Sequence, residues 1–81
     1  YQPALNYPRQ ARRMNREGVV ILEADIDAQG RLRGVRVIRE AGYGFDEAAM
    51  EMVMNSRFSP AEASGRNVAV RMRFTIRFEL E

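Results

Sequence analysis

The fold is decided by the last long stretch of the chain, Asn67-Val-Ala-Val-Arg-Met-Arg-Phe-Thr-Ile-Arg-Phe-Glu-Leu80. Its apolar residues fall on every second position, and polar or small residues fill the gaps. A period of two sorts side chains onto the two faces of a β-strand, whereas a helix would spread them around its circumference. The stretch therefore predicts a long strand with one buried face, formed by Val68, Val70, Met72, Phe74, Ile76, Phe78 and Leu80. Because it ends almost at the end of the chain, we expect an edge strand with a free row of backbone groups.

Composition limits the chemistry that the rest of the chain can perform. The chain has 81 residues, which is enough for one small domain with a modest core. It contains no cysteine and no histidine, so it has no thiolate nucleophile, no zinc cluster of these ligands and no imidazole base. We therefore expect a protein that is not an enzyme, with no catalytic residue, no metal and no cofactor.

Charge gives only a weak indication of a partner. All 13 basic residues are arginines, but 11 acidic residues leave a net charge of +2. Nucleic-acid binding usually needs a concentrated basic face, so no nucleic-acid partner is expected. The chain has no apolar run of membrane-spanning length. It begins without methionine, and we expect it to be a piece of a longer protein.

The first half of the chain predicts one helix and two strands. Tyr7-Pro8 begins the helix, because proline suits the first helical position; we expect it to run through Asn15 and to end at Gly18. Residues Val19–Asp27 predict a central strand, since the beginning of this run is apolar on both faces. A turn containing Gly30 then returns the chain antiparallel along Leu32–Arg39.

Three carboxylates, Glu23, Asp25 and Asp27, resemble a cluster for metal binding or acid–base chemistry. Alternation places Glu23 and Asp25 on the solvent face of the first strand, and Asp27 belongs to the turn. We favour the interpretation that the two strand carboxylates pair with arginines on neighbouring strands.

A second helix begins at Phe45, with Asp46 as the expected N-cap. Its apolar face is expected to join the core, with Met50 and Met54 widening the face made by Phe45, Ala49, Met52 and Val53. Pro60 ends the segment, and residues 62–66 are expected to form a surface loop.

These elements predict an α+β fold with the order α-β-β-α-β. The connection through the second helix allows a right-handed crossover that places the last strand beside the first. The expected sheet is three-stranded and antiparallel, ordered 2-1-3, with both helices packed on one face. Arg71, Arg73 and Arg77 then lie on the open face of the edge strand.

Several short motifs in this order resemble one known family. They are Tyr7-Pro8 with Ala11, Glu17-Gly18-Val19-Val20, Asp27 with Gly30, Val35 with Val37, Phe45-Asp46 with Ala48-Ala49 and Val53, Arg57-Phe58 and Pro60-Ala61. Together with the final alternation, they resemble the C-terminal domain of TonB-like energy transducers of Gram-negative envelopes. On this resemblance residues 1–6 are a lead-in and residues 7–81 form the TonB-like domain. The pattern departs from many members in having Ser56 where they carry tryptophan, and in having Gln2-Pro3 further upstream of Tyr7-Pro8.

The resemblance implies a periplasmic domain on an inner-membrane anchor, driven by a proton-powered motor. Such a domain captures an extended segment of an outer-membrane transporter, the TonB box, as an added strand beside its last strand. The residues expected to contact this partner are Asn6, Tyr7, Val70, Arg71, Met72, Arg73, Phe74, Thr75, Ile76, Arg77 and Phe78. A homodimer through the same edge is a further expectation.

Other hypotheses remain open at this point. The same fold can serve other envelope machinery, such as secretion or surface motility. An arginine-rich RNA-binding domain would need paired exposed aromatic side chains on its strands, which this pattern does not supply. A carboxylate enzyme would need an acid–base pair in a cleft.

Overall fold

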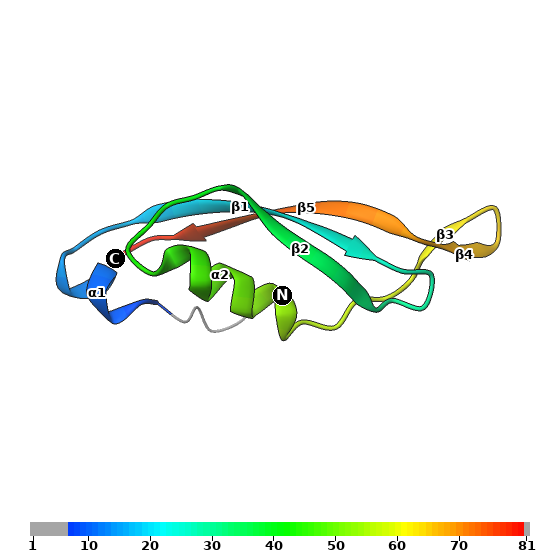
Figure 1. Ribbon diagram of the computed structural model, residues 1–81, viewed down its shortest axis with the longest axis horizontal. Helices are drawn as coiled ribbons and strands as arrows, with labels where there is room; N and C mark the ends of the chain where they lie inside the picture. Colours follow the sequence, from blue (N-terminus) through cyan, green and yellow to red (C-terminus); the bar gives the residue numbers. More distant parts are fainter. Residues whose placement is uncertain (1–6, 81) are drawn as a thin grey trace.

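The computed structural model describes residues 7–80, and it has the predicted α+β architecture (Figure 1). Its elements are α1 (Arg9–Arg13), β1 (Gly18–Ile26), β2 (Leu32–Arg39), α2 (Phe45–Met54), β3 (Ala61–Ala63), β4 (Arg66–Val68) and β5 (Val70–Phe78). The main sheet has the order β2-β1-β5 and is antiparallel throughout. This confirms the predicted order, with the first strand in the centre and the last long strand at an edge. Both helices lie on the same side of the sheet.

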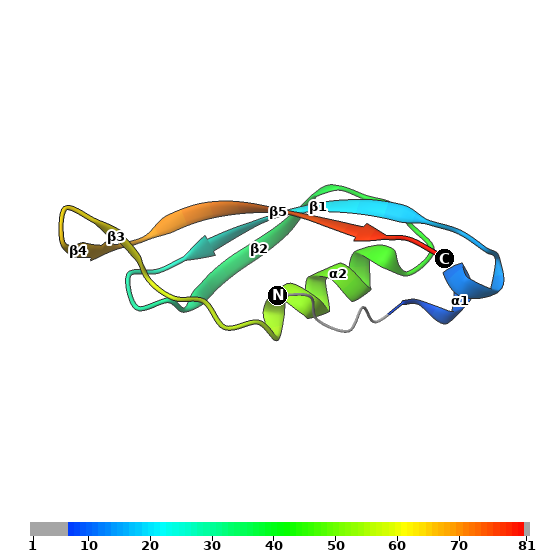
Figure 2. The ribbon, with the colours of Figure 1, turned by 180° about the vertical axis from the view of Figure 1, so that it is seen from behind.

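The pairing of β1 with β5 is regular along its whole length. Residues of the two strands face each other one to one, from Gly18 opposite Phe78 to Ile26 opposite Val70. Figure 2 shows β5 running from the end that carries β3 and β4 to the end near α1. The pairing of β1 with β2 has two register shifts, one of them between Ile21 and Leu22. The regular ladder therefore pairs the whole length of β5 with the central strand.

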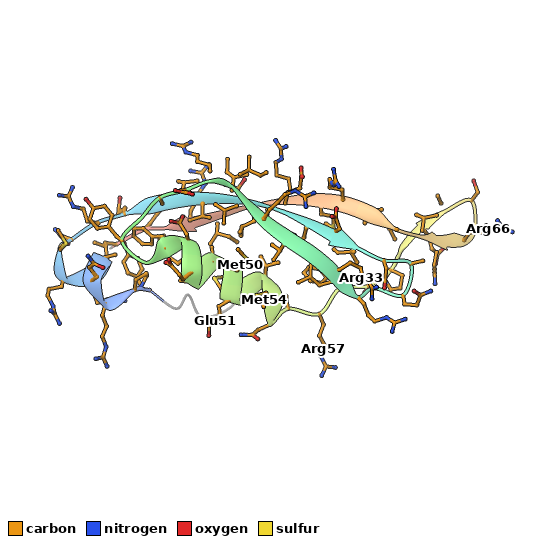
Figure 3. All side chains as sticks on the ribbon, viewed as in Figure 1. Arg33, Met50, Glu51, Met54, Arg57 and Arg66 are labelled. Carbon is orange, nitrogen blue, oxygen red and sulfur yellow. The ribbon has the colours of Figure 1, made fainter. Side chains whose placement is uncertain are left out.

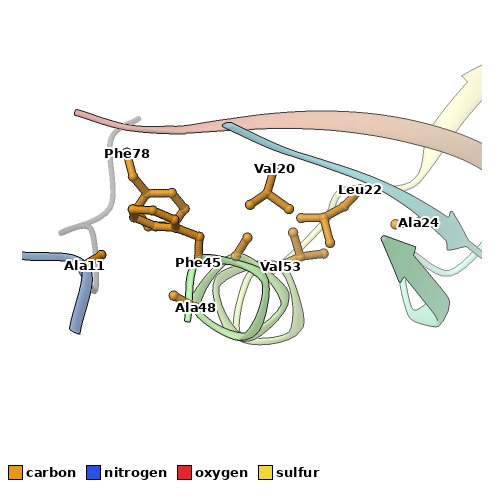
Figure 4. Close-up of a cluster of buried hydrophobic side chains, with 9 residues drawn as sticks. Ala11, Val20, Leu22, Ala24, Phe45, Ala48, Val53 and Phe78 are labelled. Atoms are coloured by element: carbon orange, nitrogen blue, oxygen red, sulfur yellow. The ribbon is translucent and has the colours of Figure 1, made fainter. Parts of the chain in front are cut away.

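The core lies between β1 and α2, as the period-two pattern predicts. Val20, Leu22 and Ala24 of β1 are fully buried, and Ile26 is nearly so. Helix α2 packs against β1 and β2 with Phe45, Ala48, Ala49 and Val53. Figure 4 shows the Phe45 ring of α2 beside the Phe78 ring of β5, and their centroids are 4.8 Å apart. This aromatic contact joins the start of α2 to the end of the edge strand.

The expected limits of both helices need correction. The first helix ends at Arg13 and not near Gly18, because the chain turns at Asn15, whose φ is 60°; asparagine adopts this left-handed conformation more easily than most residues. The N-cap of α2 is Gly44, with φ of 83°, so the prediction of Asp46 was wrong. The carboxylate of Asp46 instead accepts hydrogen bonds from the backbone N–H groups of Ala41 and Gly42. It thereby holds the loop that leads into the helix.

The predicted strand over residues 67–80 is broken at Ala69. Val70 lies opposite the last residue of β1, Ile26, so residues before Val70 have no β1 partner. They pair with β3 instead and form a short hairpin, in which Ala61 faces Val68. The expected surface loop over residues 62–66 is therefore part of this hairpin, and its turn has positive φ at Ser64 and Gly65.

Two methionines that were expected in the core are exposed. Met54 is 60% exposed and lies at the end of α2 (Figure 3), and Met72 of β5 is 42% exposed. Met50 and Met52 are partly buried against the core, as predicted. Among the residues described, neither helix is long and apolar enough to cross a membrane.

Candidate functional site

The candidate site is the open edge of β5. This strand is nine residues long and pairs with β1 on one side, and it is the outermost strand of the main sheet. In an antiparallel ladder, alternate residues direct their N–H and C=O groups toward the neighbour, and the others direct them away. An extended peptide of another chain can therefore form a second ladder along the free side of β5.

The two faces of β5 differ in chemistry. Phe78 is fully buried, Val70, Phe74 and Ile76 are partly buried, and these side chains lie on the helix side. Arg71, Arg73, Thr75 and Arg77 are exposed on the opposite, open face. A strand added beside β5 would continue both faces, since side chains of neighbouring strands stand in the same rows.

The arginines at the start of β5 are already paired within the chain. Arg71 Nε donates a 2.7 Å hydrogen bond to Asp25 Oδ1, and Arg73 Nη2 lies 3.3 Å from Glu23 Oε2. From the other side, Arg36 of β2 lies 2.8 Å from Glu23 Oε1 and 3.3 Å from Asp25 Oδ2. This confirms that Glu23 and Asp25 serve neighbouring arginines. We call these five side chains, from all three strands, the central ion cluster.

The central ion cluster shifts the pKa values of its acids. Hydrogen bonding to Arg36, with a further contribution from Arg73, lowers the pKa of Glu23. Hydrogen bonding to Arg71 and then to Arg36 lowers the pKa of Asp25. The two carboxylates together raise the pKa of Arg36. Both acids therefore remain charged at pH values where an isolated carboxyl group would begin to take up a proton.

Arg77 has a different neighbour on β1. It lies opposite Val19, which carries no charge, and within residues 7–80 no ion pair to Arg77 is formed. The acid nearest to it along the chain is Glu79, which follows the end of β5 and is also exposed. The open face of β5 therefore presents one arginine whose charge is not used by the sheet.

Tyr7 connects the start of the described chain to the end of β5. Its ring stands edge-on to the rings of Phe45 and Phe78, at centroid distances of 5.6 and 5.8 Å. Its hydroxyl donates a hydrogen bond to the backbone carbonyl of Arg16. Partial burial, assisted by the charge of Glu17, raises the pKa of Tyr7. The aromatic contacts make Tyr7 part of the packing around β5.

A surface groove of about 450 Å³ lies at the Val70 end of β5. It is lined by Asp25, Ile26, Asp27, Arg33, Ala69, Val70 and Arg71. Both of its acids have partners, since Asp25 belongs to the central ion cluster and Asp27 accepts hydrogen bonds from the N–H groups of Gln29 and Arg31 in the turn. In the part of the chain that the structure describes, no group of three or more acidic side chains is arranged to hold a metal ion.

Comparison with known proteins identifies the family. The family model of the Gram-negative bacterial TonB protein C-terminal region matches residues 3–80. The chain belongs to this family. Protein TonB of Vibrio cholerae serotype O1 is 38% identical over 76 residues, which cover 93% of this chain and 31% of that protein. Protein TonB of Xanthomonas campestris pv. campestris (strain B100) is 33% identical over 75 residues, which cover 91% of this chain and 34% of that protein.

The family assignment confirms the resemblance inferred from the motifs. The chain spans about a third of the length of the TonB proteins that it matches. What it shares with them is therefore their C-terminal domain, and the assignment by itself concerns this domain alone.

The residues predicted to contact a partner fall into three groups in this TonB domain. Those from Val70 to Phe78 form one strand, as expected. Tyr7 joins this strand at its Phe78 end through the aromatic contact, and Asn6 lies outside the residues that the structure describes. Within β5, the structure separates the paired Arg71 and Arg73 from Arg77.

Two further residues shape the edge and were not among the site residues predicted from the sequence. Phe58, from the segment after α2, lies beside Phe74 with ring centroids 5.8 Å apart, so it supports the middle of β5 from the helix side. Val19 determines that Arg77 has no acidic neighbour on β1. The sequence shows that Val19 is uncharged, but only the register of β1 and β5 shows that it lies opposite Arg77.

Proposed function

We propose that this TonB domain is the periplasmic C-terminal part of an energy transducer of the envelope. In this proposal it binds an extended segment of an outer-membrane transporter by adding the segment as a fourth strand along β5. The observation that carries the proposal is the position of β5, a nine-residue strand at the edge of the sheet.

Strand addition suits this edge energetically. Each backbone hydrogen bond contributes a net stabilisation of roughly 0.5–1.5 kcal/mol, and a peptide spanning β5 forms several of them. The free side of β5 belongs to a strand whose other side is fully paired with β1, so the template is already formed before the partner arrives. Main-chain bonds give affinity with little demand on sequence, and the side-chain rows add specificity.

Force transmission is the second part of the proposal. An inner-membrane anchor, coupled to a proton-driven motor, would apply tension through the residues that precede Tyr7. The Tyr7 ring contacts Phe78 directly, so the tension would reach the domain beside the end of the strand that holds the partner. Asn6, which is outside the described residues, is proposed as a further contact of this partner.

The same edge can also pair with β5 of a second copy of this chain. Such a homodimer and a transporter segment would compete, because both need the free backbone groups of β5. We propose the dimer as the state adopted at high concentration without a partner.

A chemical-shift titration tests strand addition. The domain, at a concentration where it is monomeric, is titrated with a short peptide from the N-terminal region of a cognate transporter. We expect amide shifts concentrated in residues 70–78, together with new protection of alternate β5 amides from hydrogen exchange. The matched control is the same peptide with alternate backbone nitrogens methylated, which removes donors and leaves the side chains unchanged.

The two peptides distinguish the outcomes. Binding of the unmodified peptide alone supports a hydrogen-bonded strand. Equal binding of both peptides, or shifts confined to α2, would overturn strand addition at β5. If the folded monomer shows no amide shifts with any transporter peptide, its partner is instead another component of the envelope.

A further inference from the structure

The three arginines on the open face of β5 are not equivalent, and the difference indicates what kind of segment the edge accepts. We infer that Arg77 selects a partner strand carrying a carboxylate directly opposite it, with apolar residues on either side of that carboxylate. The inference rests on the proposed strand addition, and it assigns the specificity of that edge to one side chain.

The register of β1 and β5 supplies the first argument. Arg71 lies opposite Asp25 and Arg73 lies opposite Glu23, and both arginines are held in the central ion cluster. A partner acid beside either of them would have to share a guanidinium with an acid of the sheet. Arg77 lies opposite Val19, so a partner acid beside it meets no competitor across the strand.

The nearby acids further restrict where along β5 a partner carboxylate can lie. Glu79 stands two residues beyond Arg77, just after the end of β5, and Glu17 uses its Oε2 to accept a hydrogen bond from the Leu80 N–H group. A partner acid placed beyond Arg77, beside Glu79, would be repelled by these two charges. Directly opposite side chains in neighbouring strands have Cβ atoms about 4.5–5.5 Å apart, while diagonal neighbours are about 7–8 Å apart. The favourable place is therefore the one facing Arg77.

The helix side of β5 supplies the argument for apolar neighbours. Helix α2 packs against β1 and β2, and it leaves the side chains of β5 on this side less covered than those of β1. Met72 is 42% exposed, and Phe74 and Ile76 are only partly buried. Residues of an added strand that alternate with the carboxylate would extend over this row and bury its apolar surface.

The test uses two designed peptides that differ in one residue. Both are capped and alternate valine with serine, and one central serine is replaced by glutamate in the first peptide and by glutamine in the second. Amide shifts of β5 report strand addition for each peptide independently of charge. At low salt, we expect the glutamate peptide to bind about two- to fivefold more tightly, the range for an exposed cross-strand ion pair.

Variants then locate the charge preference. Arg77→Gln is expected to remove the preference for glutamate, and Arg77→Glu is expected to favour a third peptide with lysine at the same place. Arg66→Gln is the matched control, because it removes one exposed arginine at the hairpin at the other end of the molecule (Figure 3). It is expected to keep the preference. Arg73→Gln is expected to lower the stability of the domain while the glutamate preference remains.

The outcomes separate this inference from the proposed function. If both peptides add along β5 with equal affinity, or if the preference is lost in Arg73→Gln and kept in Arg77→Gln, the assignment to Arg77 is wrong and strand addition stands. If neither these peptides nor transporter peptides shift β5, the proposed function itself fails. Loss of the preference in Arg66→Gln would also overturn the inference, because it would reveal a general charge effect.

Discussion

Gly18 offers a sharp test of the aromatic packing that fixes the end of β5. It is the first residue of β1, and it lies opposite Phe78. A Cβ atom added there would stand 2.7 and 2.9 Å from two ring carbons of Phe45 and 3.0 Å from the Cβ of Ala41. Carbon atoms attract each other best at about 3.5–4.0 Å, so Gly18→Ala forces the ring or the strand to move.

The size of the effect follows from how firmly Phe45 is held. Its ring is fully buried and lies 4.8 Å from the Phe78 ring and 5.6 Å from the Tyr7 ring. Overpacking of this kind costs about 1–3 kcal/mol. Replacing a strand glycine with alanine returns about 0.5–1 kcal/mol, because alanine loses less conformational freedom on folding. We therefore expect a net loss of about 1 kcal/mol, which lowers Tm by roughly 4–8 °C in a domain of this size.

Gly34→Ala is the matched control, since Gly34 also lies in a strand and has no positive φ. An added Cβ would have its nearest neighbour at 3.8 Å, the Oδ2 of Asp25, which is ordinary contact. This variant is expected to be more stable than wild type by about 0.5–1 kcal/mol. Urea unfolding followed by circular dichroism measures both variants. If Gly18→Ala is as stable as Gly34→Ala, the Phe45 ring is not confined and the reasoning fails.

Three further perturbations test other parts of the molecule. The pKa values of Glu23 and Asp25 are lowered in the folded state, so the stabilisation that these carboxylates contribute is complete above their unfolded pKa values and is lost as the pH falls through their folded pKa values. Between pH 7 and pH 2, the urea midpoint should therefore fall more for the wild type than for the double variant Glu23→Gln/Asp25→Asn. Parallel curves for the two proteins would refute the contribution of these carboxylates. Tyr7→Phe removes the hydrogen bond to the carbonyl of Arg16 and keeps the ring contacts, so thermal unfolding should show a loss of about 0.5–1.5 kcal/mol while the peptide-induced shifts of β5 persist. Met54 is 60% exposed, so Met54→Ser should change the free energy of unfolding by less than about 0.5 kcal/mol; a larger loss would mean that the methionine packs against the domain.

Much of the fold followed from periodicity alone. The alternation in β1 and β5 predicted which face of each strand is buried, and the two-sided apolar beginning of β1 predicted its central place. The break at Ala69 did not follow, because it depends on where the partner strand ends: β1 stops at Ile26, opposite Val70. The hairpin of β3 and β4 had a local signal in Ser64-Gly65, a turn dipeptide between two short runs, but three-residue strands are too short to show a period.

The helix ends were missed for a different reason. Aspartate is a common N-cap residue, so Asp46 was a reasonable prediction. The sequence alone does not show whether its carboxylate caps the helix or binds the loop that precedes the helix. In the structure Phe45 is the first residue of α2, and its ring lies against that of Phe78. The helix therefore begins before Asp46, and the carboxylate binds Ala41 and Gly42 instead. The cap is therefore Gly44, whose left-handed backbone conformation a glycine adopts without strain.

The sequence pattern also could not show which charged side chains of the edge strand are paired within the sheet. Alternation alone places Arg71, Arg73 and Arg77 in one equivalent row, and each could be assigned to a partner. The one-to-one register with β1 sets two of them opposite acids and the third opposite Val19. An arginine that faces an acid of its own sheet stabilises that sheet, and a partner gains little by approaching it. An arginine that faces an apolar residue has no acid opposite it on the neighbouring strand, so it can pair with an acid on the open side. If a partner adds along β5 as we propose, the part of the edge that discriminates between partners is determined by Val19 on the neighbouring strand, which does not itself face the partner.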